Sequence, residues 1–571
     1  MPSSLKNTRV TVLDVSRLND AERVCAATLQ GLTNREGPHL FLDYGIYDDP
    51  LARRTNEVFL DDETWYGKYR ELLGAQDQRN LAYYQQRYGF EVEHAHGLLE
   101  LIHASRAVIN GLVIWDEALP NTVNIAVMLA ARQYLLPVSA ALAEQLQSAN
   151  LPLKEDLRGR WKERTDLYRW AFDNLFTRCK PGYLACIEPG WQRPEFIDYL
   201  VQNQIFIYNL SATAGGFGSQ LLMLLVFGPT RLREFLFTTR LDALIRNFAL
   251  AWMGLRNEEV KLSNRIQRAV KSLPYPTIFG WHTRRDDELS FMLQLSANGL
   301  RLVPSHLAAN ISFHARMPAT LVRYTPKTTA PALDPQGVYL TFTLSDGDQL
   351  MMMSTGELGN WYSPERGKIP FNWETQPLLV ELAPALLEKY TTTATENDCL
   401  IAGPSGAGYI VPPLAPRLER YMEDTARVCA RAGINVVTTY VADPPARVRN
   451  ILARHSGAVL GFLSGYAVVN DAPMHLLNGK PLVANKLPGV TQIWLKADDL
   501  LEAVRQEVTR PASRPRFIGV HLFAYRTTYL DVVRFLESLK DEHVHVVRGD
   551  EFLHLAREHL LKTQNKGEKH D

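Results

Sequence analysis

Short apolar runs alternate with amphipathic segments throughout the second half of this 571-residue chain. From about residue 274 we count eight candidate strands, several of them followed by an amphipathic helix: 276–281, 300–304, 338–345, 399–403, 434–441, 457–463, 516–524 and 543–547. About eight βα units in roughly 280 residues have the size of a (β/α) barrel, complete or lacking one strand. An open doubly wound sheet is the alternative arrangement of the same units.

The first half of the chain also alternates, starting with a strand at 9–16, a helix at 19–32 and a strand at 39–44. We expect a helix to begin near Val92 and to lead into a strand at 107–115. The chain is therefore predicted to be α/β throughout. Its predicted domains are an N-terminal α/β region over 1–270, with a subdivision near 150 as an option, a barrel-like domain over 274–555 and a polar tail over 556–571.

Composition excludes several classes of partner. The 62 basic and 62 acidic residues balance, so neither a nucleic acid nor an anionic membrane is an expected partner. Five scattered cysteines without zinc-site spacing predict reduced thiols, and no N-terminal signal region or membrane-length apolar run is present. We therefore expect a cytoplasmic protein acting on a small molecule, with its oligomeric state left open.

In a barrel, the chemistry lies at the carboxyl ends of the strands. Those ends here carry polar and aromatic residues: Trp281, His282, Ser305, His306, Asp346, Asp348, Ser405, Asp443, Ser464, Tyr466, His521 and Tyr525. We expect these side chains to share one rim.

Two acids, Asp346 and Asp348, follow the strand at 338–345, and Gly347 between them allows a tight turn. Paired carboxyls serve acid–base chemistry when their pKa values are pushed apart. The alternative is an Asp-Gly turn that only caps the next helix.

The segment Gly403 to Tyr409 (GPSGAGY) also follows a predicted strand. Its backbone N–H groups could hold an anion, with Ser405 as a nucleophile, or the glycines could serve only to turn Tyr409 into the site. The predicted substrate-binding residues are Trp281, Gln349, Arg366, Trp373, Ser405, Gly406, Gly408, Tyr409 and His521. The tryptophans, Trp361 included, could instead be core packing.

Several of these motifs resemble the GxGYxYP family. Gly406 to Pro412 (GAGYIVP) is similar to its signature and Ser345 to Gln349 to its SDGD(N) segment, while Gly280-Trp281 with Glu288, Asn310 to Ser312, and Arg366 with Trp373 add further matches. The resemblance extends over nearly the whole chain and implies a glycoside hydrolase with a barrel architecture. Val411 stands where the family has its second tyrosine, and Gln349 where it has asparagine.

A glycosidase needs one protonated and one charged carboxyl. We assign proton donation to Asp348 and the charged role to Asp346, with Glu288 and Glu357 as candidate partners. No cofactor is expected. Two other classes stay open: a metal-dependent, deacetylase-like hydrolase holding a divalent ion with Asp346, Asp348, His282 and His521, and a non-catalytic carbohydrate- or metabolite-binding protein.

Overall fold

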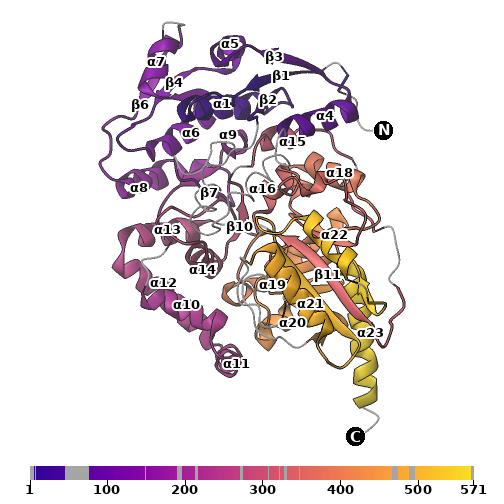
Figure 1. Ribbon diagram of the computed structural model, residues 1–571. Helices are drawn as coiled ribbons and strands as arrows, with labels where there is room; N and C mark the ends of the chain where they lie inside the picture. The colour runs from indigo at the N-terminus through magenta and orange to yellow at the C-terminus, as the bar shows by residue number, and fades with distance from the viewer. Residues whose placement is uncertain are drawn as a thin grey trace.

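The computed structural model (Figure 1) describes most of the chain. The described residues are 5–6, 8–45, 76–147, 150–189, 196–212, 216–270, 274–306, 308–320, 322–326, 331–345, 347–465, 474–485, 487, 495–539 and 541–567.

Two three-stranded parallel sheets form the N-terminal end of the molecule, at the top of Figure 1. The first has the order β2 (Leu40–Asp43), β1 (Arg9–Asp14), β3 (Glu91–Ala95), and the second β5 (Leu135–Val138), β4 (Gly111–Ile114), β6 (Leu153–Asp156). Their helices are α1 (Asp20–Thr33), α4 (Gln76–Tyr88), α5 (Leu98–Ala104), α6 (Thr122–Gln133), α7 (Ala140–Gln147) and α8 (Arg164–Asn174). Helix α1 begins at a capping box between Asn19 and Glu22, which explains its sharp start.

The prediction that a helix begins near Val92 is wrong, because this segment is strand β3, which pairs in parallel with β1. Glu91 and Glu93 alternate on its exposed side, a two-residue period that a short edge strand shows without a strong apolar signal. The helix itself, α5, starts only at Leu98.

A third sheet lies between the N-terminal and C-terminal parts and contains two strands predicted for the barrel. Its parallel order is β10 (Arg301–Pro304), β9 (Thr277–Gly280), β7 (Tyr183–Cys186), β8 (Phe206–Tyr208). Strands β9 and β10 therefore pair with earlier strands and not with β11. The accompanying helices are α9 (Ile197–Asn203), α10 (Phe217–Phe227), α11 (Thr230–Thr238), α12 (Leu241–Arg256), α13 (Glu258–Ala269), α14 (Glu288–Asn298) and α15 (Ile311–His314).

The largest sheet has nine strands and follows in the C-terminal half. Its order is β16 (His475–Leu477), β17 (Lys480–Ala484), β15 (Gly461–Ser464), β14 (Val436–Thr439), β13 (Asp398–Ala402), β12 (Phe371–Thr375), β11 (Val338–Ser345), β18 (Arg516–Phe523), with β19 (Val544–Val546) pairing with the first residues of β11. All pairs are parallel except β16 with β17. All eight residues of β11 are buried, as expected for a central parallel strand.

This sheet curls as a half-barrel, and the closed barrel is not confirmed. Among the described residues, no ladder joins β17 to β18, although a Cβ on Gly519 would lie 2.5 Å from the Ala484 carbonyl oxygen. Strands β17 and β18 therefore approach closely without hydrogen bonding as neighbouring strands.

Helices cover both faces of the nine-stranded sheet: α16 (Gln349–Ser354), α17 (Leu379–Leu382), α18 (Pro384–Thr393), α19 (Leu418–Ala432), α20 (Ala446–His455), α21 (Ala497–Thr509), α22 (Tyr529–Ser538) and α23 (Gly549–Gly567). Helix α23 packs Phe552 and Leu553 on Tyr339 and Ile401 of one face, and it continues well past residue 556. The five cysteines form no disulfide. Every helix in the described part of the chain is too short or too polar to cross a lipid bilayer.

Candidate active site

The carboxyl ends of β9, β10 and β11 bring together residues from two different sheets. Trp281 follows β9, His306 lies two residues after β10, and Asp348 lies three residues after β11. Gly347 has a φ of +83°, which a side-chain-bearing residue rarely adopts, so the tight turn expected before Asp348 is present. Helix α16 then starts at Gln349 and packs against β10. The site therefore lies where the third sheet meets the nine-stranded sheet.

Asp348 and His306 form the polar centre of this cluster. Asp348 Oδ2 lies 3.3 Å from His306 Nε2, and the two residues are only 5% and 7% exposed. The His306 ring lies 5.1 Å from the Trp281 ring. Asp348 Oδ1 is buried and has no hydrogen-bond partner among the described residues, which leaves one carboxylate oxygen available to a ligand.

Glu288, the first residue of α14, provides a second carboxyl. Its Oε1 accepts a hydrogen bond of 2.9 Å from the Tyr409 hydroxyl, and the residue is half-buried. Burial and, next in importance, the charge of Asp348 raise the pKa of Glu288 to about 7. A carboxyl with this pKa is substantially protonated at neutral pH and can donate a proton.

The segment from Gly403 to Tyr409 holds Tyr409 in place through its backbone. Tyr409 exchanges two backbone hydrogen bonds with Leu302 of β10, at 2.6 and 2.9 Å. The Tyr421 hydroxyl lies 2.7 Å from the Ser405 carbonyl oxygen and 2.6 Å from that of Gly408. This segment thus links the third sheet to helix α19 and directs Tyr409 to Glu288.

The polar groups of this segment are mostly used within the protein. The Ser405 hydroxyl donates to the Ile410 carbonyl at 2.6 Å, and the Ala407 N–H donates to Thr425 at 3.2 Å. The Gly408 N–H donates to the Gly406 carbonyl at 3.0 Å. These bonds favour the positioning of Tyr409 over a serine nucleophile or an anion cradle.

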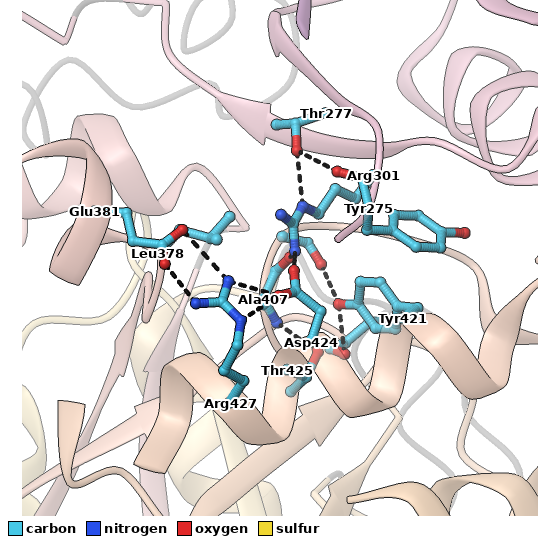
Figure 2. A network of polar contacts seen from close by, with 12 residues as sticks. Tyr275, Thr277, Arg301, Leu378, Glu381, Ala407, Tyr421, Asp424, Thr425 and Arg427 are labelled. Carbon is cyan, nitrogen blue, oxygen red and sulfur yellow. Dashed lines mark hydrogen bonds and ion pairs between the residues drawn. The ribbon is translucent and has the colours of Figure 1, made fainter. Parts of the chain in front are cut away.

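A buried ion pair between Arg301 and Asp424 holds the segment from Gly403 to Tyr409 in place, as Figure 2 shows. Arg301 Nη1 lies 2.5 Å from Asp424 Oδ2 and donates to the Ala407 carbonyl at 3.1 Å, while its Nε donates to Thr277 at 2.8 Å. Asp424 also accepts from Arg427, whose other nitrogen binds Glu381 near the surface. β10 and α19 are therefore held together immediately behind the candidate site.

Two further acids lie near the carboxyl end of β12, and Glu374 was missed because the segment FNWET was not predicted as a strand. Burial raises the pKa of Glu374 to about 8, although it accepts a hydrogen bond from the Thr438 hydroxyl. Burial and the nearby Glu374 raise the pKa of Glu357 well above its ordinary value. Neither Glu357 oxygen has a hydrogen-bond partner among the described residues, and its φ is +55°. Glu374 is the fourth of the five residues of β12, so recognising this strand would have placed its carboxyl near the carboxyl end of the strand.

Gln349 and His521 are two further predicted substrate-binding residues. Gln349 Oε1 accepts a hydrogen bond of 2.6 Å from Gln376 Nε2. Gln349 therefore connects the turn at Asp348 with the end of β12. His521 of β18 is level with Thr343 of β11, and it therefore shares a sheet face with that residue.

Arg366 and Trp373 lie at a different place from the other predicted site residues. Both side chains bind the Asp398 carboxylate. The Trp373 indole N–H donates to Asp398 Oδ1 at 2.8 Å, and Trp373 is fully buried. Asp398 is the first residue of β13, so this cluster lies toward the amino ends of the strands. Their contacts are those of packing residues, and nothing in them brings Arg366 or Trp373 to Asp348.

Asp346 lies outside the described residues. Within the described part of the chain, no group of three or more His, Cys, Asp or Glu side chains is arranged to hold a metal ion. Because the proposed metal set includes Asp346, the divalent-ion alternative stays a prediction.

Comparisons with known proteins agree with the family resemblance. Residues 336–557 match the model described as "GxGYxYP putative glycoside hydrolase C-terminal domain", and residues 109–179 match the "GxGYxYP_N second domain". A crystal structure described as "a putative hydrolase" from Bacteroides thetaiotaomicron VPI-5482 has a TM-score of 0.74 and 18% identity, covering 98% of this chain and 96% of that one. At this identity the likeness shows the fold alone. No curated protein matches this sequence.

Proposed function

Because this chain belongs to the GxGYxYP family, we propose that it hydrolyses a glycosidic bond of a sugar or glycoconjugate at Glu288 and Asp348. The family description supplies the reaction class. The observation that carries the proposal is the pairing of a half-buried Glu288, whose pKa is about 7, with the neighbouring charge of Asp348. Two carboxyls in different protonation states are what glycoside hydrolysis requires.

Glu288 is the general acid in this proposal. At a pH below about 7 it holds the proton that the leaving oxygen of the substrate must receive. The role of proton donor thus moves from Asp348, where the sequence alone placed it, to Glu288. Tyr409 is a positioning residue, because its hydroxyl orients the Glu288 carboxyl.

Asp348 is the charged partner, either activating water or attacking the sugar carbon directly. His306, 3.3 Å away, keeps one carboxylate oxygen oriented while the other stays available to the substrate. Trp281, which is only 8% exposed, packs against the His306 ring and supports its position beside Asp348.

Leaving-group dependence tests the assignment. For Glu288→Gln we expect a loss of about 10²–10⁴-fold in kcat/KM on alkyl or 4-nitrophenyl glycosides, and a much smaller loss on 2,4-dinitrophenyl glycosides, which need no proton. Asp348→Asn should be impaired on both kinds of substrate. Tyr409→Phe removes a hydrogen bond that lowers the pKa of Glu288, so the fall in rate above about pH 7 should move to higher pH.

Glu117→Gln, a change at an exposed turn residue, is the control and should leave all rates unchanged. Unaltered turnover in both Glu288→Gln and Asp348→Asn would contradict the proposal. A wild-type protein that binds sugars in calorimetry but cleaves no glycoside, with both variants weakening that binding, would support the carbohydrate-binding alternative instead.

A further inference from the structure

A pocket of about 210 Å³ lies between helix α12 and the helices α19 and α20, away from the residues proposed for glycoside hydrolysis. Its walls include the first two turns of α12 and of α20. The charged residues that line it are Arg240, Asp242, Arg246, Glu419 and Arg447. Pockets for drug-sized ligands measure roughly 300–1,000 Å³, so this pocket has room only for a smaller ligand.

Arg246 is buried at this pocket without a hydrogen bond. Its side chain is only 9% exposed, and none of its N–H groups donates to any residue that the structure describes. A guanidinium has five N–H donors, and buried donors are nearly always paired. Arg301, whose side chain is 4% exposed, donates to three different acceptors. Arg246 therefore lacks the acceptors that a buried arginine of this same protein has.

Asp242 compensates the charge of Arg246 only in part. Asp242 Oδ2 lies 3.8 Å from Arg246 Nη1, and Asp242 Oδ1 lies 3.6 Å from Arg447 Nη1. Hydrogen bonds between charged groups are about 2.7–2.9 Å long, so both ion pairs are too long to be hydrogen bonds. Burial lowers the pKa of Arg246 despite the nearby carboxylate. Both arginines thus keep N–H donors for another group.

The rest of the pocket also favours an anion. Arg240 immediately precedes α12 and Arg447 is the second residue of α20, so two helices direct their positive amino ends to this place. Three arginines against two carboxylates leave a net charge of +1 in the lining. All other lining residues in the described part of the chain are apolar, and none of their side chains can accept a hydrogen bond from the arginines.

We propose that this pocket binds a small oxyanion, the phosphate or carboxylate group of a small metabolite, between Arg246 and Arg447. A guanidinium offers paired N–H groups that match either group of oxygens. Both arginines lie within ion-pair distance of the same carboxylate, that of Asp242, so one small anion can reach both. Arg246 supplies the buried contact, and Arg447, with a side chain 42% exposed, supplies the contact nearer to solvent. This site does not depend on the proposed hydrolysis.

Titration calorimetry with inorganic phosphate and, separately, with acetate tests the proposal at constant ionic strength. The wild-type protein should bind at least one of the two anions saturably, with one ion per chain. The tighter of the two shows whether the natural ligand carries a phosphate or a carboxylate. Absence of saturable binding of both anions overturns the proposal.

Variants of the two arginines test which residues bind the anion. Arg246→Gln and Arg447→Gln should each weaken binding by about tenfold or more, because each removes charge-assisted hydrogen bonds. Arg447 is exposed, so Arg447→Gln should keep the wild-type Tm even if Arg246→Gln does not. Arg231→Gln, which removes the same charge from the exposed start of α11, is the matched control and should bind as wild type. Equal affinities in all three variants would overturn the assignment.

A crystal structure locates the anion directly. Crystals grown without phosphate or sulfate are soaked in selenate if phosphate binds, or in bromoacetate if acetate binds. We expect an anomalous peak beside Arg246 and Arg447, with oxygens at hydrogen-bond distance from both. A peak elsewhere contradicts the proposal. So does a pocket that holds only water, with Arg246 hydrogen-bonded directly to Asp242.

Discussion

At the scale of single residues, surroundings decide what each glutamate of this protein can do. Glu288 and Glu374 have pKa values raised to about 7 and about 8, mainly by burial. Glu381, although partly buried, has a lowered pKa because it accepts hydrogen bonds from Arg427. The same side chain is therefore a proton donor in one environment and a fixed charge in another.

Glu374→Gln should change how stability depends on pH. The folded protein holds the Glu374 proton up to about pH 8, while an unfolded chain releases it near its ordinary pKa of 4.5. The contribution of Glu374 to stability thus falls as pH rises through this window, by about 1.4 kcal/mol per pH unit. Glutamine does not titrate, so the variant should gain in Tm relative to wild type between acidic and mildly alkaline pH.

Calorimetric scans at several pH values measure this difference. Glu117→Gln, at an exposed turn, should follow the wild-type pH dependence throughout. Parallel Tm curves for wild type and Glu374→Gln would show that Glu374 ionises without difficulty in the folded state.

At the scale of elements, the segment from Gly403 to Tyr409 depends on close backbone approach. Gly408 has a φ of +96°, and a Cβ there would lie 2.9 Å from Arg301 Cδ and 3.1 Å from the Leu302 carbonyl oxygen. A side chain at this position must displace the strand pair that carries Tyr409, and with it the hydroxyl that binds Glu288.

We therefore expect Gly408→Ala to lower the Tm by several degrees and to reduce activity more than stability alone explains. Gly159→Ala is a matched control, because Gly159 also has a positive φ of +67° but nothing lies within 4 Å of an added Cβ. Thermal unfolding and kcat/KM measure the two effects. Equal effects of the two substitutions would show that backbone conformation, and not the contact with Arg301, is what requires Gly408.

At the scale of the whole molecule, the third sheet and the nine-stranded sheet are joined behind the site by the Arg301–Asp424 pair. Both side chains are almost fully buried, at 4% and 0% exposure. The site is built from both sheets, so this junction affects its geometry as well as stability.

Asp424→Asn leaves Arg301 as an uncompensated buried charge and should cost about 3–5 kcal/mol. Glu381→Gln, in the exposed arm of the same network (Figure 2), should cost less than about 1 kcal/mol. Denaturant or thermal unfolding compares the two variants. A similar small cost for both would mean that the junction does not depend on the buried pair.

Much of the fold could be predicted from the sequence, because burial has a local signature. All eight strands expected after residue 274 are present, since each is a short apolar run that a buried parallel strand requires. Strand β12 was missed because Asn372 and Glu374, both buried, interrupt its apolar pattern.

The sequence by itself determined the α/β class, the family and the turn that places Asp348. Only the tertiary structure decided that β9 and β10 join the third sheet, that Glu288 binds Tyr409 within the influence of the Asp348 charge, and that Arg366 and Trp373 bind Asp398 instead. The physical reason is that periodicity records whether a residue is buried. Strand pairing and pKa values depend on which residues, distant in the sequence, pack against a given residue. The local sequence does not contain that information.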